Sequence, residues 1–428
     1  MAPANMMKRL AIISAAALMT AAPTLALAHD EDQGVVETYA NIAHATFEDS
    51  LITAKALQDA IDAFLAVPTE ENLQAAKDAW LAARVPYQQT EAYRFGNAIV
   101  DDWEGRVNAW PLDEGLIDYV DASAYGWESD TNPLFNANII ANKTININGE
   151  TLTVDEITPE FLGEKLHEAG GVEANVATGY HAIEFLLWGQ DLNGTDAGAG
   201  NRAATDFSLD NCTNDNCDRR RQYLDAASDL LVTDLEEMVA NWEQSGAARA
   251  ALEEKSEAEV LNTILTGLGS LSYGELAGER MKLGLLLNDP EEEHDCFSDN
   301  THNSHYYDAK GIQNVYLGRY ERLDGTVVEG TSVAHYVSHA DEAVAEELRA
   351  DIAATMDAFT AMVERADTEA YDQMIGEGNE EGNKVVQDAI DALVKQTRSI
   401  ERAVAALKLE GVELEGSDSL DNPDAVFE

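Results

Sequence analysis

Apolar residues recur at spacings of three and four over most of the chain, which is the pattern of helices that bury one face. Residues 33–67 predict the first helix, and Pro68-Thr69 ends it and caps the next helix, which starts at Glu70. Pro86 should kink this second helix before it stops at Gly96. Further helices are predicted from Arg219 and over residues 256–271, 341–366 and 383–407. Amphipathic helices therefore account for most of the chain.

One short segment has the alternating pattern of β-structure instead. Residues 139–154, IIANKTININGETLTV, alternate apolar and polar positions around Asn148-Gly149, a dipeptide that favours a two-residue hairpin turn. The acidic segment 411–428 follows the last helix, and we expect it to be a disordered tail. The predicted fold class is therefore all-α with a small surface β-hairpin.

The two halves of the helical pattern share an order of polar residues. A helix with Glu91 precedes a shaped loop with Asp113, and a helix with Glu279 precedes a loop with Asp299. We interpret this order as a weak internal duplication. The resulting prediction is two antiparallel helical bundles related by duplication, over residues 29–250 and 251–410.

The first 28 residues have the pattern of a secretory signal peptide. Lys8 and Arg9 precede an apolar run over residues 10–20, and Ala26-Leu27-Ala28 forms a cleavage site, so the mature chain is expected to begin at His29. The residue directly after that site is not a cysteine, which argues against a lipoprotein. No later run is long and apolar enough to span a bilayer. We therefore expect a periplasmic or secreted protein without a transmembrane segment.

The chain is strongly acidic. It has 80 acidic and 27 basic residues, a formal net charge of −53. Such a surface repels nucleic acid and anionic lipid but attracts cations, so the charge excludes a nucleic-acid partner and permits a cationic ligand. Salt-adapted organisms make many acidic proteins of unrelated function, and we assign the larger share of the charge to solvation.

Two of the three cysteines lie close together in a polar loop. Cys212 and Cys217 are expected to form a local disulfide, because the predicted compartment is oxidising. A metal clip is the alternative, but neither a histidine nor a third cysteine lies nearby in the sequence. Cys296 is then either a free, buried thiol or a member of the second polar loop described below.

The segment TGYHAIEFLLWGQD, residues 178–191, contains the most suggestive chemistry. His181 and Glu184 are three residues apart, a spacing that places both side chains on one face of a helix. Apolar residues surround the pair, so Glu184 should be buried, where an unpartnered carboxylate would be costly. A structural His–Glu hydrogen bond and a metal or catalytic site both satisfy this pattern, and at this point both stay open.

Two other polar segments carry candidate ligands. Glu91 and Arg94 lie in an aromatic setting and are either a surface ion pair or part of a site. A polar loop after Pro290 contains the possible metal donors Glu293, His294, Cys296, Asp299 and His302. We rank this loop below His181 and Glu184, because a hydrogen-bonded turn explains its composition equally simply.

Several segments carry a family resemblance, and they span most of the mature chain: TEAYRFG at 90–96, NAWPLDEGLIDYV at 108–120, GYHAIEFLLWGQD at 179–191, CTNDNCDRRRQYL at 212–224, GELAGERM at 274–281 and EEEHDCFSDNTH at 291–302. Together they resemble the imelysin family, specifically its iron-regulated protein A branch, which is similar to the imelysin-like domain of the periplasmic iron-uptake component EfeO. The family element G-x-H-x-x-E is present as Gly179, His181 and Glu184.

This resemblance implies a duplicated helical-bundle fold, an envelope location and expression linked to iron supply. It also implies a cleft between the bundles, where the G-x-H-x-x-E pair meets the glutamate and arginine of the first segment. The cleft candidates implied by the resemblance are Glu91, Arg94, Asp113, His181 and Glu184.

Our leading hypothesis is a periplasmic, non-enzymatic protein that binds iron or another divalent metal, or a metal chelate, in iron acquisition. His181 and Glu184 would hold the metal with help from Glu91 and Asp113, because carboxylate and imidazole donors suit iron at least as well as zinc. Arg94 would orient a carboxylate or contact an anionic chelator. Envelope iron-transport components are the expected protein partners.

Two alternatives belong to different functional classes. The first is a metallopeptidase, since the family name carries a claim of peptidase activity. Zincins, however, use two histidines at i and i+4 with a glutamate between them, whereas this segment has only His181 and Glu184 and would need a distant third ligand. The second alternative is a metal-free site for a small ligand or protein partner, in which the His–Glu pair is structural.

Overall fold

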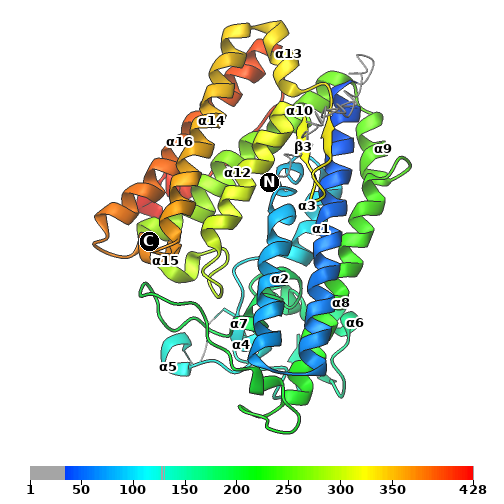
Figure 1. Cartoon of the computed structure of the whole chain (residues 1–428), viewed down its shortest axis with the longest axis vertical. Coiled ribbons are helices and arrows are strands. Elements are labelled where there is room, and N and C mark those ends of the chain that lie inside the picture. The colour runs from blue at the N-terminus through cyan, green and yellow to red at the C-terminus, as the bar shows by residue number, and fades with distance from the viewer. Residues whose placement is uncertain (1–33, 127–128, 130, 428) are drawn as a thin grey trace, which may run out of the picture.

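The computed structural model of the protein describes residues 34–126, 129 and 131–427, so the predicted signal peptide, residues 1–28, lies outside the described residues. Three long helices of the first half pack side by side (Figure 1), namely α1 (Val35–Ala66), α2 (Glu70–Gln88) and α8 (Cys217–Trp242). The apolar stripes predicted from the sequence face one another in this group. Thr69 caps α2 as predicted, since its hydroxyl accepts a hydrogen bond from the Asn72 amide at 3.3 Å.

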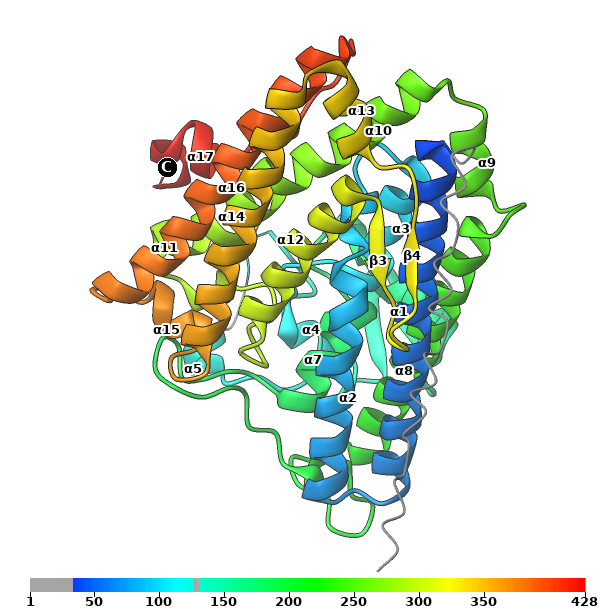
Figure 2. The same cartoon turned by 45° about the horizontal axis from the view of Figure 1, so that its top comes forward.

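A second group of long helices lies beside the first (Figure 2). It comprises α10 (Glu257–Ser270), the π-helix η5 (Leu271–Lys282), α12 (Thr301–Leu317), α14 (Glu342–Ala366) and α16 (Glu380–Leu407). Helix α14 packs on both α12 and α16, and α12 also packs against α2, so α12 joins the two groups. The predicted all-α class is confirmed, while the internal duplication stays a prediction.

Shorter elements connect the long helices. In the first half these are η1 (Glu91–Tyr93), α3 (Ala98–Asn108), α4 (Glu114–Ile117), α5 (Ala122–Tyr125), α6 (Pro159–Phe161), η2 (Leu162–Leu166), η3 (Ala169–Gly171), α7 (Gly179–Trp188), η4 (Ala204–Phe207) and α9 (Ala247–Glu253). In the second half they are α11 (Leu283–Leu287), η6 (Pro290–Glu292), α13 (Val333–Ala340), α15 (Tyr371–Ile375), α17 (Asp418–Asp421) and η7 (Pro423–Phe427). None of the helices in the described part of the chain combines the length and apolarity of a bilayer span.

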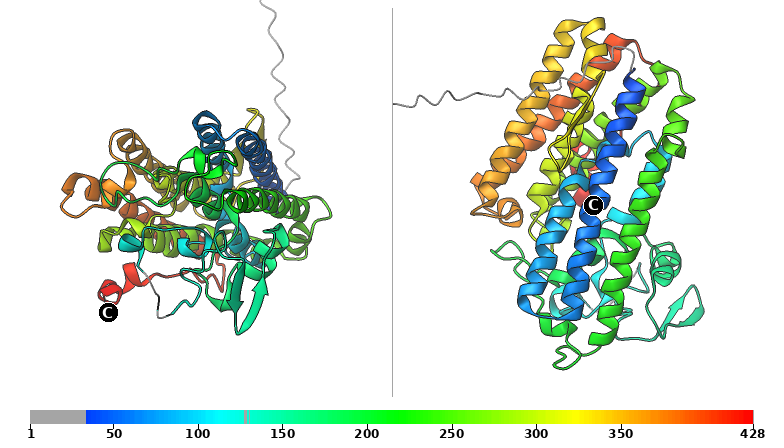
Figure 3. Two further views of the ribbon diagram at one scale, coloured as in Figure 1. Left: turned by 90° about the horizontal axis from the view of Figure 1, so that it is seen from below. Right: turned by 45° about the vertical axis from the view of Figure 1, so that its right-hand side comes forward.

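The predicted hairpin forms where the sequence places it. Strands β1 (Thr144–Ile147) and β2 (Glu150–Thr153) pair antiparallel, and the hairpin stands out from the helices (Figure 3). Asn148 and Gly149 both have positive φ, as a two-residue turn of this kind requires. A second hairpin, β3 (Arg319–Glu321) with β4 (Val327–Glu329), was not predicted, although Asp324-Gly325 between its strands is a turn signal of the same type.

Two predicted helix boundaries differ in the structure. Helix α2 ends at Gln88 rather than at Gly96, because the Thr90 hydroxyl and amide both bond the Tyr87 carbonyl at 2.6 and 2.7 Å and start a separate turn. The polar loop after Pro290 ends earlier than expected, since α12 begins at Thr301 and includes His302.

The expectation of a disordered tail does not hold for residues 414–421. The Glu415 amide donates to Ser270 at 3.0 Å, and the Ser419 hydroxyl donates to the Gly278 carbonyl at 2.9 Å. Added Cβ atoms at Gly269 and Gly278 would collide with Leu414 and Ser417 of the tail. A Cβ at Gly274 would lie 2.7 Å from the Glu415 carbonyl oxygen, so glycines along α10 and η5 let the tail pack closely against these helices.

Candidate functional site

Helix α7 carries the G-x-H-x-x-E element, and all of its residues are buried. Gly179 has a φ of 78°, and a Cβ there would overlap the carbonyl oxygen of Val107, so both conformation and space require glycine. His181 and Glu184 contact each other directly, with His181 Nδ1 lying 3.1 Å from Glu184 Oε2. The predicted pairing across one helical turn therefore forms inside the protein rather than on its surface.

Glu184 is also held by the second half of the chain. Its Oε1 accepts hydrogen bonds from the Ser298 amide at 3.0 Å and from the Ser298 hydroxyl at 2.7 Å. Burial, followed by the nearby Asp295 carboxylate, raises the pKa of Glu184 well above its ordinary value. Ser298 lies in the loop that precedes α12, so this loop closes over α7.

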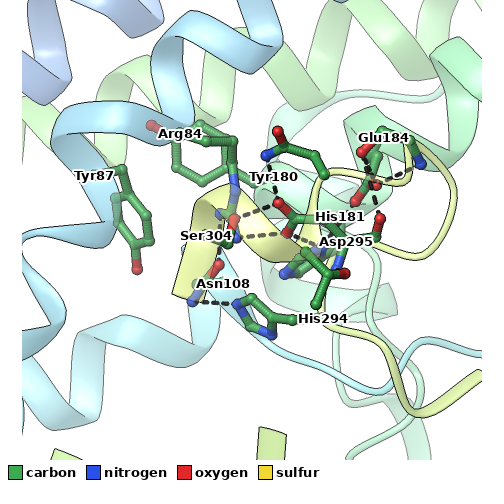
Figure 4. A network of polar contacts seen from close by, with 12 residues as sticks. Arg84, Tyr87, Asn108, Tyr180, His181, Glu184, His294, Asp295 and Ser304 are labelled. Atoms are coloured by element: carbon green, nitrogen blue, oxygen red, sulfur yellow. Dashed lines mark hydrogen bonds and ion pairs between the residues drawn. The ribbon is translucent and has the colours of Figure 1, made fainter. Parts of the chain in front are cut away.

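The same loop brings a second histidine to the first. The His181 and His294 rings lie 4.7 Å apart between centroids, and His181 Nδ1 lies 4.0 Å from Asp295 Oδ1 (Figure 4). One ligand atom from each of these three buried residues lies within 4.8 Å of the other two. His181 from the first candidate site and His294 from the second therefore belong to one group, and Asp295 is its third member.

Arg84 of α2 fixes the position of Asp295. Its Nη2 donates to Asp295 Oδ1 at 2.9 Å and its Nη1 donates to Asn108 Oδ1 at 2.7 Å (Figure 4). The other oxygen of Asp295 accepts from Asn300 at 2.8 Å and from the Ser304 hydroxyl. Every polar atom of this carboxylate thus has a defined partner, which holds it rigidly between the two halves.

Glu91 and Arg94 lie next to this group but outside it. Asn108 Nδ2 is 3.3 Å from Glu91 Oε1 and 3.3 Å from His294 Nε2, so the amide links Glu91 to the histidine. Glu91 Oε2 is taken by Arg280 at 2.7 Å. Arg94 Nη1 lies 3.9 Å from Glu91 Oε2, and Arg94 pairs more closely with Asp101 at 3.0 Å and Glu275 at 3.2 Å. The structure therefore places both residues in a supporting ion-pair network.

The π-helix η5 explains why this network forms. Glu275 and Arg280 are five residues apart, and the wider turn of a π-helix brings residues at that spacing nearer to one face than an α-helix does. Arg280 Nε donates to Glu275 at 2.9 Å, and Arg280 Nη1 donates to Asp308 at 3.1 Å. An ordinary α-helix would separate these side chains, so α-helical spacing could not predict the contact.

Asp113 is not brought to the histidines. Its carboxylate accepts from Asn132 and lies 3.5 Å from the Tyr125 hydroxyl, within the loop that follows Pro111. Trp110 reaches the centre from this segment instead, with its ring 5.1 Å from that of His181. The side chain of Asp113 therefore stabilises the loop, and Asp295 supplies the carboxylate that was expected from it.

The other candidate metal donors of the loop after Pro290 do not join the histidine centre. Glu293 and Asp299 face carboxylates from other segments, and His302 lies in the first turn of α12. Cys296 is a free, buried thiol, as one of the two sequence-based interpretations predicted. Cys212 and Cys217 form the expected disulfide.

Burial controls the electrostatics of the histidines. It is the largest cause that lowers the pKa values of His181 and His294 well below the ordinary value, so both rings are neutral at physiological pH. Neutral imidazole is the form that binds metals. His181 Nε2 is buried and has no hydrogen-bond partner among the described residues. Two imidazoles and a carboxylate are a donor set that fits iron, zinc or a similar divalent metal.

A cleft of about 490 Å³ leads from the surface to His294. Asn108 and Trp110 line it from the first half, and Arg280 lines it from the second. Its glutamates outnumber its arginines by six to two: Glu104, Glu168, Glu173, Glu275, Glu279 and Glu292 against Arg94 and Arg280. Such an acidic entrance attracts cations.

Sequence reasoning missed three residues of this centre: Arg84, Asn108 and Asp295. Arg84 had a readable signal, because it occupies the apolar stripe of α2 between Trp80 and Tyr87, where a charge needs a partner. Asp295 directly follows His294 and could have been included with it. Asn108 had no such signal, since its importance depends on contacts with three distant segments.

The fold and this centre define an all-helical protein with a buried histidine–carboxylate group at the junction of two helical groups. The chain belongs to the imelysin family: the family model for imelysin, also labelled peptidase M75, matches residues 43–400. The family resemblance read from the sequence is thereby confirmed.

Three known proteins are similar to this chain in sequence or fold. The chain is 23% identical over 387 residues to iron-regulated protein A of Synechococcus elongatus, covering 88% of this chain and 84% of that protein. Its fold is similar to a protein of Parabacteroides distasonis described as an iron-regulated protein A precursor, with a TM-score of 0.62, 18% identity, and coverage of 87% and 94% of the two chains. An imelysin-like protein of Psychrobacter arcticum gives a TM-score of 0.55, 16% identity, and coverage of 88% and 94%.

Proposed function

We propose that this chain binds iron or another divalent transition metal, as an ion or a chelate, through His181, His294 and Asp295. Glu184 orients His181, and the binding serves iron acquisition in the cell envelope. The observation that carries the proposal is a buried, unpartnered His181 nitrogen beside a second neutral imidazole and a carboxylate, with one donor atom from each residue within 4.8 Å of the others. Metal binding would satisfy that nitrogen.

Three further observations support this proposal. The acidic cleft reaches His294 from the surface and offers a route for a cation. A curated relative of similar length is named for its regulation by iron. The buried Arg84–Asp295 pair and the Glu184–Ser298 bonds hold the donors before any ligand arrives, which lowers the entropic cost of binding. Envelope iron-transport components remain the proposed partners, and a periplasmic location remains part of the proposal.

Peptide hydrolysis is less well supported by the geometry. A general base must contact the attacking water, but Oε2 of Glu184 faces His181 Nδ1 and Oε1 accepts two hydrogen bonds from Ser298. We therefore place Glu184 as the carboxylate that orients a ligand histidine, as many metal sites have. Metal-loaded protein should cleave no peptide, and chelator-sensitive cleavage that disappears in Glu184→Gln would favour the peptidase instead.

Cobalt(II) titration of the mature chain tests the metal proposal, because the visible spectrum of cobalt reports the number and kind of its ligands. The experiment needs a background without the exposed His335 and His339, whose rings lie 4.2 Å apart on α13 and could bind metal by themselves. In that His335→Ala/His339→Ala background we expect about one bound cobalt per chain.

Variants of the buried residues then locate the cobalt. His181→Ala and His294→Ala should abolish the absorption band, while Glu184→Gln should weaken binding by roughly 10–100-fold. His44→Ala on α1 is the matched control. His44 pairs with Glu48 at 3.7 Å, away from the buried histidines, and this variant should bind as the parent does. Equal cobalt binding by His181→Ala, His294→Ala and the parent would refute the site. Absence of binding in the parent would favour the metal-free docking interpretation.

A further inference from the structure

A second group of acidic side chains lies near the histidine centre but contains no imidazole. It consists of Asp191, which follows α7, Asp299 in the loop before α12, and Asp372 in α15. One carboxylate oxygen from each residue lies within 4.8 Å of the other two. Three segments that are distant in sequence therefore bring like charges together inside the fold.

These carboxylates have no basic partner. Within the part of the chain that the structure describes, no ion pair with lysine, arginine or histidine involves Asp191, Asp299 or Asp372. Asp372 is 1% exposed, and among the described residues neither of its oxygens has a hydrogen-bond partner of ordinary geometry, although the Gln373 amide lies near. Asp299 Oδ1 is likewise buried without a hydrogen-bond partner in the described ranges. Like charges gathered in this way repel one another unless a cation joins them.

A fourth carboxylate faces the same group and supplies an independent observation. Glu293 is 1% exposed, and both of its oxygens lack a hydrogen bond of acceptable geometry, although the Thr301 hydroxyl lies near. The charges that act on Glu293 come from Asp372, Asp299 and Asp191, all of the same sign. A fully buried acidic side chain without a partner is costly and demands an explanation.

The spacing of the oxygens fits a hard divalent cation. Calcium binds oxygen ligands at roughly 2.3–2.6 Å, so ligands on opposite sides of the ion lie roughly 4.6–5.2 Å apart. The three aspartate oxygens lie within 4.8 Å of one another, so one such ion can contact all three of them. An all-carboxylate donor set selects calcium, magnesium or manganese rather than the softer metals that imidazole favours. The acidic group is therefore chemically distinct from the histidine centre.

We propose that Asp191, Asp299 and Asp372, with Glu293 beside them, form a binding site for a hard divalent cation such as calcium. The ion ties the loop after α7 and the loop before α12 to α15. Close packing of these segments is independent of the ion, since a Cβ on Gly376 at the end of α15 would lie 3.2 Å from the Thr195 side chain. The same two loops adjoin Glu184 and Asp295, so the cation stabilises the segments that frame the histidine centre.

The raised pKa values of these groups agree with an uncompensated negative cluster. Burial and then Asp372 raise the pKa of Asp299 to about 7, and burial is the largest cause that raises the pKa of Asp372 to about 6. A bound cation would lower both values, because it favours the ionised form.

Calcium-dependent thermal unfolding of the chelator-treated mature chain tests this site. The wild type should melt at a higher temperature in about 10 mM calcium than in chelator, because a ligand that binds only the folded state stabilises it. Asp299→Asn and Asp372→Asn should lose this shift and bind calcium about tenfold or more weakly by calorimetry. Asp357→Asn, at an exposed position on α14, changes the net charge equally and should keep the full shift.

Further measurements separate this site from a folding defect and from the histidine centre. In chelator the two asparagine variants should melt no lower than the wild type, because each removes a repelling charge. His181→Ala should keep the calcium shift, so a failure of the metal proposal for the histidines leaves this test intact. A wild type that gains no stability in calcium would overturn the proposal, as would calcium shifts of equal size in the wild type and Asp372→Asn.

Discussion

Replacing Arg84 with methionine tests whether charge pairing holds the histidine centre together. The guanidinium lies 2.9 Å from Asp295, and the two side chains are 1% and 0% exposed. Arg84 also donates to Asn108 at 2.7 Å, so one substitution leaves Asp295 Oδ1 and the Asn108 amide oxygen without their donor and removes the charge that balances Asp295. Methionine keeps an unbranched apolar side chain in the space, so the loss of charge should dominate over the loss of packing.

The expected magnitude follows from the burial of both partners. Breaking a buried ion pair from one side costs about 3–5 kcal/mol, and leaving the Asn108 oxygen unpaired adds about 1–3 kcal/mol. These effects share one network and do not add fully, so we expect Arg84→Met to lose about 4–6 kcal/mol of unfolding free energy. Arg84→Met/Asp295→Asn should recover about 2–3 kcal/mol of that loss, because no unpaired buried charge remains.

Urea unfolding of chelator-treated protein, followed by far-ultraviolet circular dichroism, measures these free energies. Arg402→Met is the matched control, since Arg402 pairs with Glu347 at 3.0 Å on the surface, with side chains 45% and 47% exposed. It should lose less than about 1 kcal/mol. The reasoning fails if Arg84→Met is no more destabilising than Arg402→Met, or if the effects of the Arg84 and Asp295 substitutions simply add.

Two further predictions concern α7 and the cleft. Gly179→Ala should lower the unfolding free energy by about 1–3 kcal/mol from backbone strain alone, and by more from the clash at Val107. Gly105→Ala on α3, where nothing lies within 4 Å of an added Cβ, should be neutral or stabilising. Equal urea midpoints for the two variants would contradict this prediction. Burial and then the Glu91 charge raise the pKa of Glu104 from 4.5 to about 7, so the folded state binds this proton more tightly than the unfolded state. The unfolding free energy of the wild type should therefore fall relative to that of Glu104→Gln as the pH rises from about 4.5 to about 7, by up to about 3 kcal/mol. Urea unfolding measures this difference, and a wild type that gains stability relative to Glu104→Gln over that range would refute the raised pKa.

The helical framework could be predicted because it depends on local information. The three-four spacing of apolar residues identified α1, α14 and α16 within a few residues of their observed bounds. Thr69 and Asn148-Gly149 carried their own signals as a cap and a turn. Periodicity does not report departures from α-helical geometry, which is why the π-helix η5 was not anticipated.

The candidate site could be predicted only in part, because it depends on tertiary pairing. His181 and Glu184 were found through their spacing on one helix, and their contact confirms that inference. His294 was also found, but as part of a separate loop, since no local signal shows that this loop closes over α7. Asp113 was a candidate because the family resemblance implied it, whereas Asp295 was not singled out. The resemblance did not determine which carboxylate lies near the histidines.

Metal analysis of protein purified from its native host tests the central claim most directly, because it assumes neither a particular metal nor a substrate. Wild type and His181→Ala/His294→Ala should be compared in the same host, with iron, zinc and calcium measured separately. The account predicts about one equivalent of a transition metal, iron foremost, in the wild type and none in the double variant. Equal transition-metal content in the two proteins would contradict it.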